Sequence, residues 1–182
     1  NIKKGVDTTW HPLLPFIREY KALCQGDSGE YIHWGATTQD IIDTGLILQI
    51  KEAMNIVEKE LKSIESILCD LAEKYKNTIM PGRTHGQHAL PITFGYKVAV
   101  WADEINRHLE RITQMKSRIF AGNLTGAVGT LASMGNQGQE VLDAVMKKLD
   151  LLTPTISWHV ARDRIADITV ILGMVGATIG KI

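Results

Sequence analysis

The sequence has little cysteine, no excess of charge and no long apolar run. Lys and Arg together number 20, as do Asp and Glu, and this zero net charge argues against a general nucleic-acid binder, which would be basic. The two cysteines, Cys24 and Cys69, have no metal-binding or redox spacing and indicate reduced thiols in a cytoplasmic protein. The longest nearly apolar stretch, residues 170–180, is about half of what a membrane span needs. We therefore expect neither a nucleic acid nor a membrane as partner.

Signatures of several catalytic classes are also missing. His85 and His88 lie three residues apart without an HExxH pattern or a nearby cysteine, so we expect no metal. No GxSxG motif or activated cysteine supports nucleophilic catalysis. The glycine-rich loop 122–130 lacks the GK[ST] ending of a phosphate-binding loop, and we expect no cofactor. Acid–base chemistry on an anionic substrate remains.

Helical patterns fill most of the chain, and no strand alternation is long enough to predict a sheet. Two long helices are expected over residues 38–75 and 91–120, each with apolar residues in alternating steps of four and three. In the second helix only His108 interrupts the apolar row. Helices of this length, roughly 45 to 55 Å, exceed what a compact domain needs. We predict an all-α fold, a long-helix bundle completed by helices of other subunits in an oligomer. Shorter helices are expected over residues 12–24, 139–149 and 162–182.

The segment 81–91 joins the two long helices and holds two prolines, two glycines, two histidines and an arginine. Glycines let a backbone approach a ligand and prolines stiffen the loop. His85 offers the one side-chain type whose ordinary pKa suits proton transfer near neutral pH. An ordered turn with surface histidines is the alternative interpretation.

Candidate anion-binding residues stand at helix ends. Thr37 and Thr38, at the start of the first long helix, offer hydroxyls and backbone N–H groups to a carboxylate or phosphate, although threonine is also an ordinary N-cap residue. Arg83, Arg162 and Arg164 can make bidentate contacts with carboxylates, although each alone could equally be solvated or ion-paired.

Two of these segments carry a resemblance to a known family. Residues 82–89, Gly-Arg-Thr-His-Gly-Gln-His-Ala, followed by Pro91–Gly95, resemble the second signature of the fumarase/aspartase superfamily, and adenylosuccinate lyases in particular. Residues 33–44 resemble the earlier signature, and residues 126–130 and 162–164 follow in the family's order. The resemblance implies an all-helical subunit of a homotetramer. It also implies an elimination beside a carboxylate that expels nitrogen or oxygen, commonly forming fumarate.

The resemblance also assigns roles. His85 matches the general acid, and Thr37 and Thr38 match the Thr-Ser pair that holds a substrate carboxylate. The remaining matches are substrate-binding positions: Arg83, Thr84, Gln87, His11, Trp158, Arg162 and Arg164. Two of these depart from the adenylosuccinate lyase pattern, since Pro12 follows His11 where an aspartate is usual, and Trp158 replaces a glutamine.

The substrate stays open between two families. The sequence of residues 33–40 and the pair Trp158-His159 resemble 3-carboxy-cis,cis-muconate cycloisomerases more closely than adenylosuccinate lyases. Those cycloisomerases, however, typically lack a histidine at position 85. We expect C–N cleavage that releases fumarate from a small carboxylate substrate, with the cycloisomerase reaction as the alternative. A non-catalytic helical scaffold would also explain the heptad rows, although it gains little from His, Arg and Thr in its loops.

The ends of the chain suggest a fragment. Asn1 is not a natural initiator, and no signal peptide is visible at the start. The superfamily's third signature, a mobile serine-rich loop with the general base, would lie beyond Ile182. We therefore expect residues 1–182 to form a single helical lyase-type domain of a longer enzyme, inactive by itself.

Overall fold

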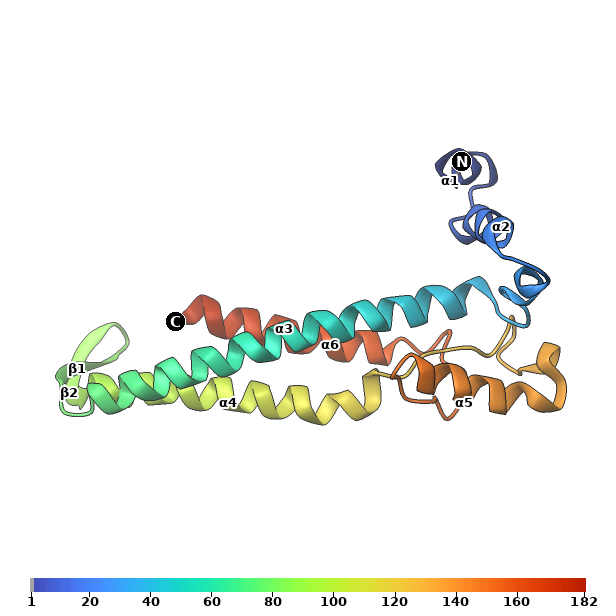
Figure 1. Cartoon of the computed structure of the whole chain (residues 1–182). Coiled ribbons are helices and arrows are strands. Elements are labelled where there is room, and N and C mark those ends of the chain that lie inside the picture. The colour runs from blue at the N-terminus through green and yellow to red at the C-terminus, as the bar shows by residue number, and fades with distance from the viewer. Residues whose placement is uncertain (1) are drawn as a thin grey trace. The chain divides into compact units, whose positions relative to one another are not determined.

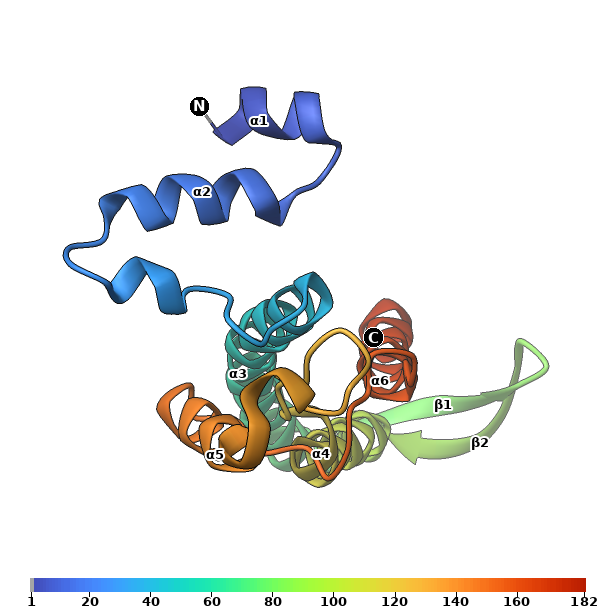
Figure 2. The same ribbon diagram turned by 90° about the vertical axis from the view of Figure 1, so that its right-hand side faces the viewer.

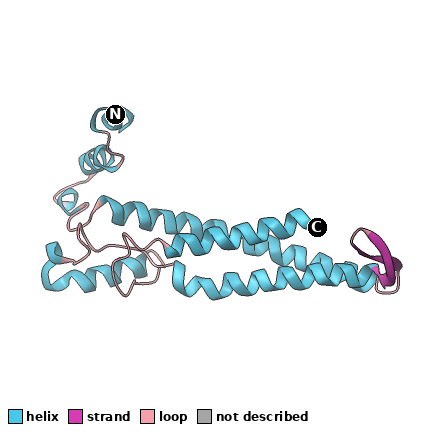
Figure 3. Ribbon diagram, turned by 180° about the vertical axis from the view of Figure 1, so that it is seen from behind, coloured by secondary structure: helices cyan, strands magenta, loops and turns pink. Residues whose placement is uncertain are grey.

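Helices make up most of the computed structural model, which describes residues 2–182 (Figure 3). The long helices are α3 (Thr38–Lys74) and α4 (Phe94–Ile119), and they confirm the predicted all-α class. The shorter helices are α1 (Ile2–Thr9), α2 (Leu13–Leu23), α5 (Gly138–Lys148) and α6 (Asp163–Lys181). Two 3₁₀ turns, η1 (Ser28–Tyr31) and η2 (Ala132–Gln137), complete the helical elements. Except for α1 and the 3₁₀ turns, each of these helices was predicted to within a few residues.

The segment between the long helices is a β-hairpin, so the predicted loop over 81–91 is wrong, and α4 begins at Phe94, three residues after the predicted start near Pro91. Strands β1 (Ile79–Thr84) and β2 (Gln87–Thr93) pair antiparallel. His85 and Gly86 form the turn with φ of 50° and 71°, the two positive values of a type I′ turn. Thr93 then caps α4, since its hydroxyl accepts a hydrogen bond from the N–H of Tyr96 at 3.1 Å.

The chain forms two compact units. Unit 1 comprises the chain up to Leu48 together with Ala121–Ala161, and unit 2 comprises Gln49–Phe120 and Arg162–Ile182. The single lyase-type domain over residues 1–182 stays a prediction. In unit 1 the apolar core includes Ile47, Leu142, Met146, Leu151 and Trp158, all less than a tenth exposed.

The core of unit 2 follows the heptad row of α4. Val98, Ile105, Ile112, Met115 and Ile119 are fully buried, as the four-three spacing predicted. The two long helices run antiparallel, because Gly95 at the start of α4 lies against the backbone of Ala72 near the end of α3, and Lys116 near the end of α4 pairs with Glu58 of α3 at 2.5 Å. The antiparallel packing predicted from the short connection is therefore confirmed.

Helix α6 lies along α4 in the opposite direction (Figure 1). Arg118 near the end of α4 binds Asp167 near the start of α6 at 3.2 Å, and His108 in the middle of α4 lies 2.8 Å from the hydroxyl of Thr178 near the end of α6. The hairpin lies at the N-terminal end of α4, where its two strands extend as a ribbon (Figure 2).

Candidate active site

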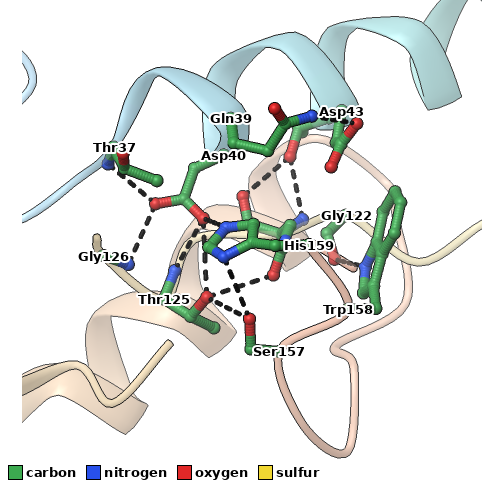
Figure 4. A network of polar contacts seen from close by, with 12 residues as sticks. Thr37, Gln39, Asp40, Asp43, Gly122, Thr125, Gly126, Ser157, Trp158 and His159 are labelled. Atoms are coloured by element: carbon green, nitrogen blue, oxygen red, sulfur yellow. Dashed lines mark hydrogen bonds and ion pairs between the residues drawn. The ribbon is translucent and has the colours of Figure 1, made fainter. Parts of the chain in front are cut away.

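A buried carboxylate organises the polar residues of unit 1 (Figure 4). Asp40 is completely buried in the first turn of α3. Its Oδ2 accepts hydrogen bonds from the backbone N–H groups of Thr37 and Gly126, each at 2.9 Å, and its Oδ1 accepts one from the N–H of Thr125 at 3.0 Å. The bond back to Thr37 is the acidic half of a capping box, so the same residue begins the helix and binds the glycine-rich loop.

The imidazole of His159 provides a further donor to Asp40. Its Nε2 lies 2.7 Å from Oδ1 of Asp40, and its Nδ1 lies 3.3 Å from the hydroxyl of Ser157. The hydroxyl of Thr125 donates in turn to Ser157 at 3.0 Å. Because the carboxylate acts as acceptor toward three backbone N–H groups, Nε2 carries the ring proton in this arrangement. Nδ1 is then the acceptor that faces Ser157.

The conformation of the glycine-rich loop 122–130 depends on a glycine, Gly126, and on the hydroxyl of Thr44, which bridges the loop to α3. Gly126 has a φ of 80°, and a side chain there would also lie 3.0 Å from the carbonyl oxygen of Gly35. The hydroxyl of Thr44, one turn beyond Asp40, binds both the N–H and the C=O of Asn123 at 2.8 Å. These contacts fix the loop against the first turns of α3.

His11 binds one of the two predicted threonines. Its Nδ1 accepts a hydrogen bond from the N–H of Leu14 at 2.9 Å, so its Nε2 is the donor toward the Thr38 hydroxyl, 3.2 Å away. Unit 1 therefore brings together Thr37, Thr38, His11 and the glycine-rich loop. Trp158 is also in this unit, but it is 2% exposed and donates its indole N–H to the carbonyl of Gly122 at 2.9 Å. A substrate contact by Trp158 stays a prediction.

The other predicted residues belong to unit 2. His85 is at the tip of the hairpin, and Arg83, Thr84 and Gln87 beside it are likewise exposed. The side chains of these four residues make no hydrogen bond to any residue in the described part of the chain. At the far end of α4, Arg164 donates to the carbonyl oxygen of Arg118, and Arg162 is the N-cap of α6.

Sequence reasoning missed the central residues of the network. Asp40 lies in the segment 33–44 that resembles the earlier signature, and His159 lies in the pair Trp158-His159, yet neither residue was assigned a role. They lie 119 positions apart, and helical periodicity carries no information about such a pair. The aspartate three residues after an N-cap threonine was the available signal. Asn123 was also missed, although it is 1% exposed and its buried Nδ2 has no hydrogen-bond partner among the described residues.

Comparison with known proteins decides the family. A family model described as Lyase matches residues 15–182. The chain belongs to this lyase family. It is 51% identical, over its entire length, to N-acetyl-S-(2-succino)cysteine lyase of Enterococcus italicus, covering 40% of that protein. It is 46% identical to adenylosuccinate lyase of Methanocaldococcus jannaschii, again over its entire length and covering 39% of that protein.

A solved structure supports the same assignment. The crystal structure of β-carboxy-cis,cis-muconate cycloisomerase from Acinetobacter calcoaceticus has a TM-score of 0.94 and 38% identity over 99% of this chain and 42% of its own. The resemblance to the fumarase/aspartase superfamily is thereby confirmed. The chain spans about two fifths of the length of the curated relatives it matches. None of the described helices is long and apolar enough to cross a membrane.

Proposed function

We propose that the chain forms part of a lyase that eliminates a leaving group from a succinyl-substituted substrate and releases fumarate. The observation that carries the proposal is the start of α3 in a chain of this family, where Asp40 accepts from the N–H groups of Thr37 and Gly126 and so holds the helix start, with the hydroxyls of Thr37 and Thr38, against the glycine-rich loop. The first N–H groups of a helix lack intrahelical partners and favour anions. A substrate carboxylate would bind at Thr37 and Thr38.

The elimination needs one base and one acid. The base removes a proton from the carbon beside a carboxylate, the electron pair forms the C=C bond, and the bond to the leaving group breaks. His85 is the proposed acid that protonates the leaving group, and Arg83, Thr84 and Gln87 would bind substrate beside it. Arg162 and Arg164 are the proposed carboxylate ligands at the start of α6.

The leaving group is proposed to be sulfur or nitrogen. Both relatives named above act, by their names, on succinyl-bearing compounds, one with a thioether and one with an amine. We rank N-acetyl-S-(2-succino)cysteine first, because the relative with that name is 51% identical and the adenylosuccinate lyase is 46% identical. A thiol has an ordinary pKa near 8.5, so a thiolate leaves with less protonation than an amine does.

The cycloisomerase reaction is the second candidate. It is favoured by the adjacent pair Trp158-His159, and the cycloisomerase structure shares the fold of this chain with a TM-score of 0.94. In that reaction a muconate would close to a lactone and release no fumarate. A purely structural scaffold is the third candidate, and it predicts assembly without turnover of any substrate.

The active protein is proposed to be a longer, cytoplasmic homotetramer. The length of the relatives supports a longer chain. The apolar side chains of Ile56, Ile67 and Val170 in unit 2 are more than half exposed, and helices of other subunits would cover them. From the resemblance to the superfamily we also propose that the catalytic base lies outside residues 1–182.

The test uses the full-length protein with three substrates: N-acetyl-S-(2-succino)cysteine, adenylosuccinate and 3-carboxy-cis,cis-muconate. Fumarate and lactone are measured by chromatography. Fumarate from either succinyl compound supports the proposal, and lactone alone supports the cycloisomerase. Replacing both Thr37 and Thr38 with valine should raise KM, and an unchanged KM and kcat would reject their assignment to the carboxylate.

A further inference from the structure

His11 uses both of its ring nitrogens inside unit 1. Nδ1 accepts a hydrogen bond from the N–H of Leu14 at 2.9 Å, and Nε2 donates to the hydroxyl oxygen of Thr38 at 3.2 Å. A neutral imidazole has one acceptor and one donor, and both are in use here. The resemblance implied that His11 binds substrate directly, but neither ring nitrogen is left for such a bond. The influence of His11 on a bound substrate therefore passes through Thr38.

The chain around His11 fixes the position and the tautomer of the ring. The N–H of Leu14 lies in the first turn of α2, where no intrahelical acceptor exists, and His11 supplies one from three residues earlier, as an N-cap side chain does. Trp10 has a φ of 54°, which turns the chain between α1 and α2, and Pro12 has a φ of −70° that its ring holds. With Nδ1 engaged by α2, Nε2 carries the proton that faces Thr38.

The hydroxyl of Thr38 is left with its own proton to donate. Its oxygen accepts from His11, and in the described part of the chain the hydroxyl has no other hydrogen-bond partner. A donor on one side of the oxygen keeps the hydroxyl proton turned away from the imidazole. The hydroxyl of Thr37, by contrast, makes no hydrogen bond to any described residue, so nothing directs its proton. A carboxylate only accepts hydrogen bonds, and the directed proton of Thr38 suits it.

We propose that His11 is a positioning residue that prepares Thr38 to donate a hydrogen bond to a substrate carboxylate. The inference rests on the carboxylate site at Thr37 and Thr38 that is part of the proposed function. A donor that is oriented before binding loses less freedom when the substrate arrives, and a hydroxyl that accepts a hydrogen bond is itself a stronger donor. Because the carboxylate is bound in the ground state and in the transition state alike, removing His11 should affect KM more than kcat.

Two substitutions separate this role from the cap that His11 provides to α2. In His11→Asn the amide oxygen can still accept from Leu14, since asparagine is a preferred capping residue, but Thr38 loses its donor. In His11→Gln the longer side chain brings an amide N–H to the place of Nε2, but the cap on α2 is lost. We measure kcat, KM and melting temperature of the full-length protein with whichever of the three substrates the parent turns over.

The two variants should differ in opposite ways. We expect His11→Asn to raise KM about 3- to 10-fold, as for the loss of one hydrogen bond, with little change in kcat or melting temperature. His11→Gln should restore most of the parent KM and should lower the melting temperature. A double-mutant cycle then identifies the partner. Adding His11→Asn to Thr38→Val should raise KM little further, whereas adding it to Thr37→Val, the matched control, should raise KM by the same factor as in the parent.

The positioning role is wrong if His11→Asn keeps the parent KM, or if its effect in Thr38→Val is as large as in the parent. It is also wrong if His11→Asn and His11→Gln raise KM equally, since the ring itself would then contact the substrate. In each of these cases the lyase proposal stands as long as the parent releases fumarate. A parent that forms only lactone overturns the lyase proposal and leaves the test of His11 in place, whereas a parent inert with all three substrates overturns both.

Discussion

His108 is a histidine in the apolar row of α4, and its neighbours fix its protonation. It is 3% exposed, its Nε2 lies 2.8 Å from the Thr178 hydroxyl, and its Nδ1 faces Nη1 of Arg111 at 3.3 Å. Since the arginine can only donate, Nδ1 accepts and Nε2 donates to Thr178, whose hydroxyl then donates to Glu104 at 2.8 Å. The neutral imidazole thereby joins α4 to α6.

Stability should therefore depend on pH through His108. Burial first, and the Arg111 charge next, lower the pKa of His108 below its ordinary value, while Glu104 opposes this. The unfolded protein then binds more protons than the folded one between the two pKa values. The stabilisation from neutral His108 is complete above about pH 6.5 and is lost as pH falls toward the folded-state pKa. Melting temperatures measured across this range should fall less steeply for His108→Gln than for the parent. Equal slopes would contradict the role, and exposed His88→Gln is the control.

The hydroxyl of Thr178 should stabilise the fold through its hydrogen bond with His108, in addition to the packing of the side chain. In Thr178→Val the buried Nε2–H of His108 loses its acceptor, which should cost about 1–3 kcal/mol of unfolding free energy. Thr169→Val, on an exposed position of the same helix, should cost much less. Denaturant unfolding measures both, and similar losses would show that the network is unimportant.

The helices of this chain could be predicted because the spacing of apolar residues that indicates each helix lies within that helix. Steps of four and three along residues 94–119 specify which face of α4 is buried, and that face is buried in the structure. The hairpin was not predictable in the same way. Its strands hold Pro81 and Pro91 opposite each other, with a register irregularity after Pro81, and neither strand alternates. The signal was the two-residue His85-Gly86 turn, because glycine, and less often histidine, tolerates positive φ.

The close approach of α4 to α3 requires glycine at position 95. A Cβ there would lie 2.4 Å from the carbonyl oxygen of Ala72 and 2.7 Å from the backbone of Lys76. Gly95→Ala should therefore destabilise the protein by about 1–3 kcal/mol, because backbone atoms cannot move aside as a flexible side chain can. Gly173→Ala in α6 meets open space and should instead stabilise it by about 0.5–1 kcal/mol. Denaturant unfolding measures the change in unfolding free energy of each variant. Changes of opposite sign would support this packing, and an unchanged unfolding free energy for Gly95→Ala would refute it.

At the scale of the whole molecule, the predicted site residues of unit 2 stand at opposite ends of α4. The hairpin with His85 precedes Phe94, whereas Arg164 binds the carbonyl of Arg118. Phe94 and Arg118 are 24 positions apart in α4, which corresponds to about 36 Å of helix axis. A small substrate cannot touch both ends within one chain. If both residues serve one site, that site must combine unit 2 of different copies.

Mixed assemblies test this requirement. His85→Gln and Arg164→Gln should each lower the turnover of the full-length protein about 10²-fold or more, and His85→Gln should cost less with the thioether substrate than with the amine. When the two variants are denatured, mixed and reassembled, some sites receive an intact His85 from one copy and an intact Arg164 from another. Turnover should then rise to a measurable fraction of the parent's, whereas either variant reassembled alone should keep its own low turnover. A mixture no more active than its components would mean that the two residues do not share a site.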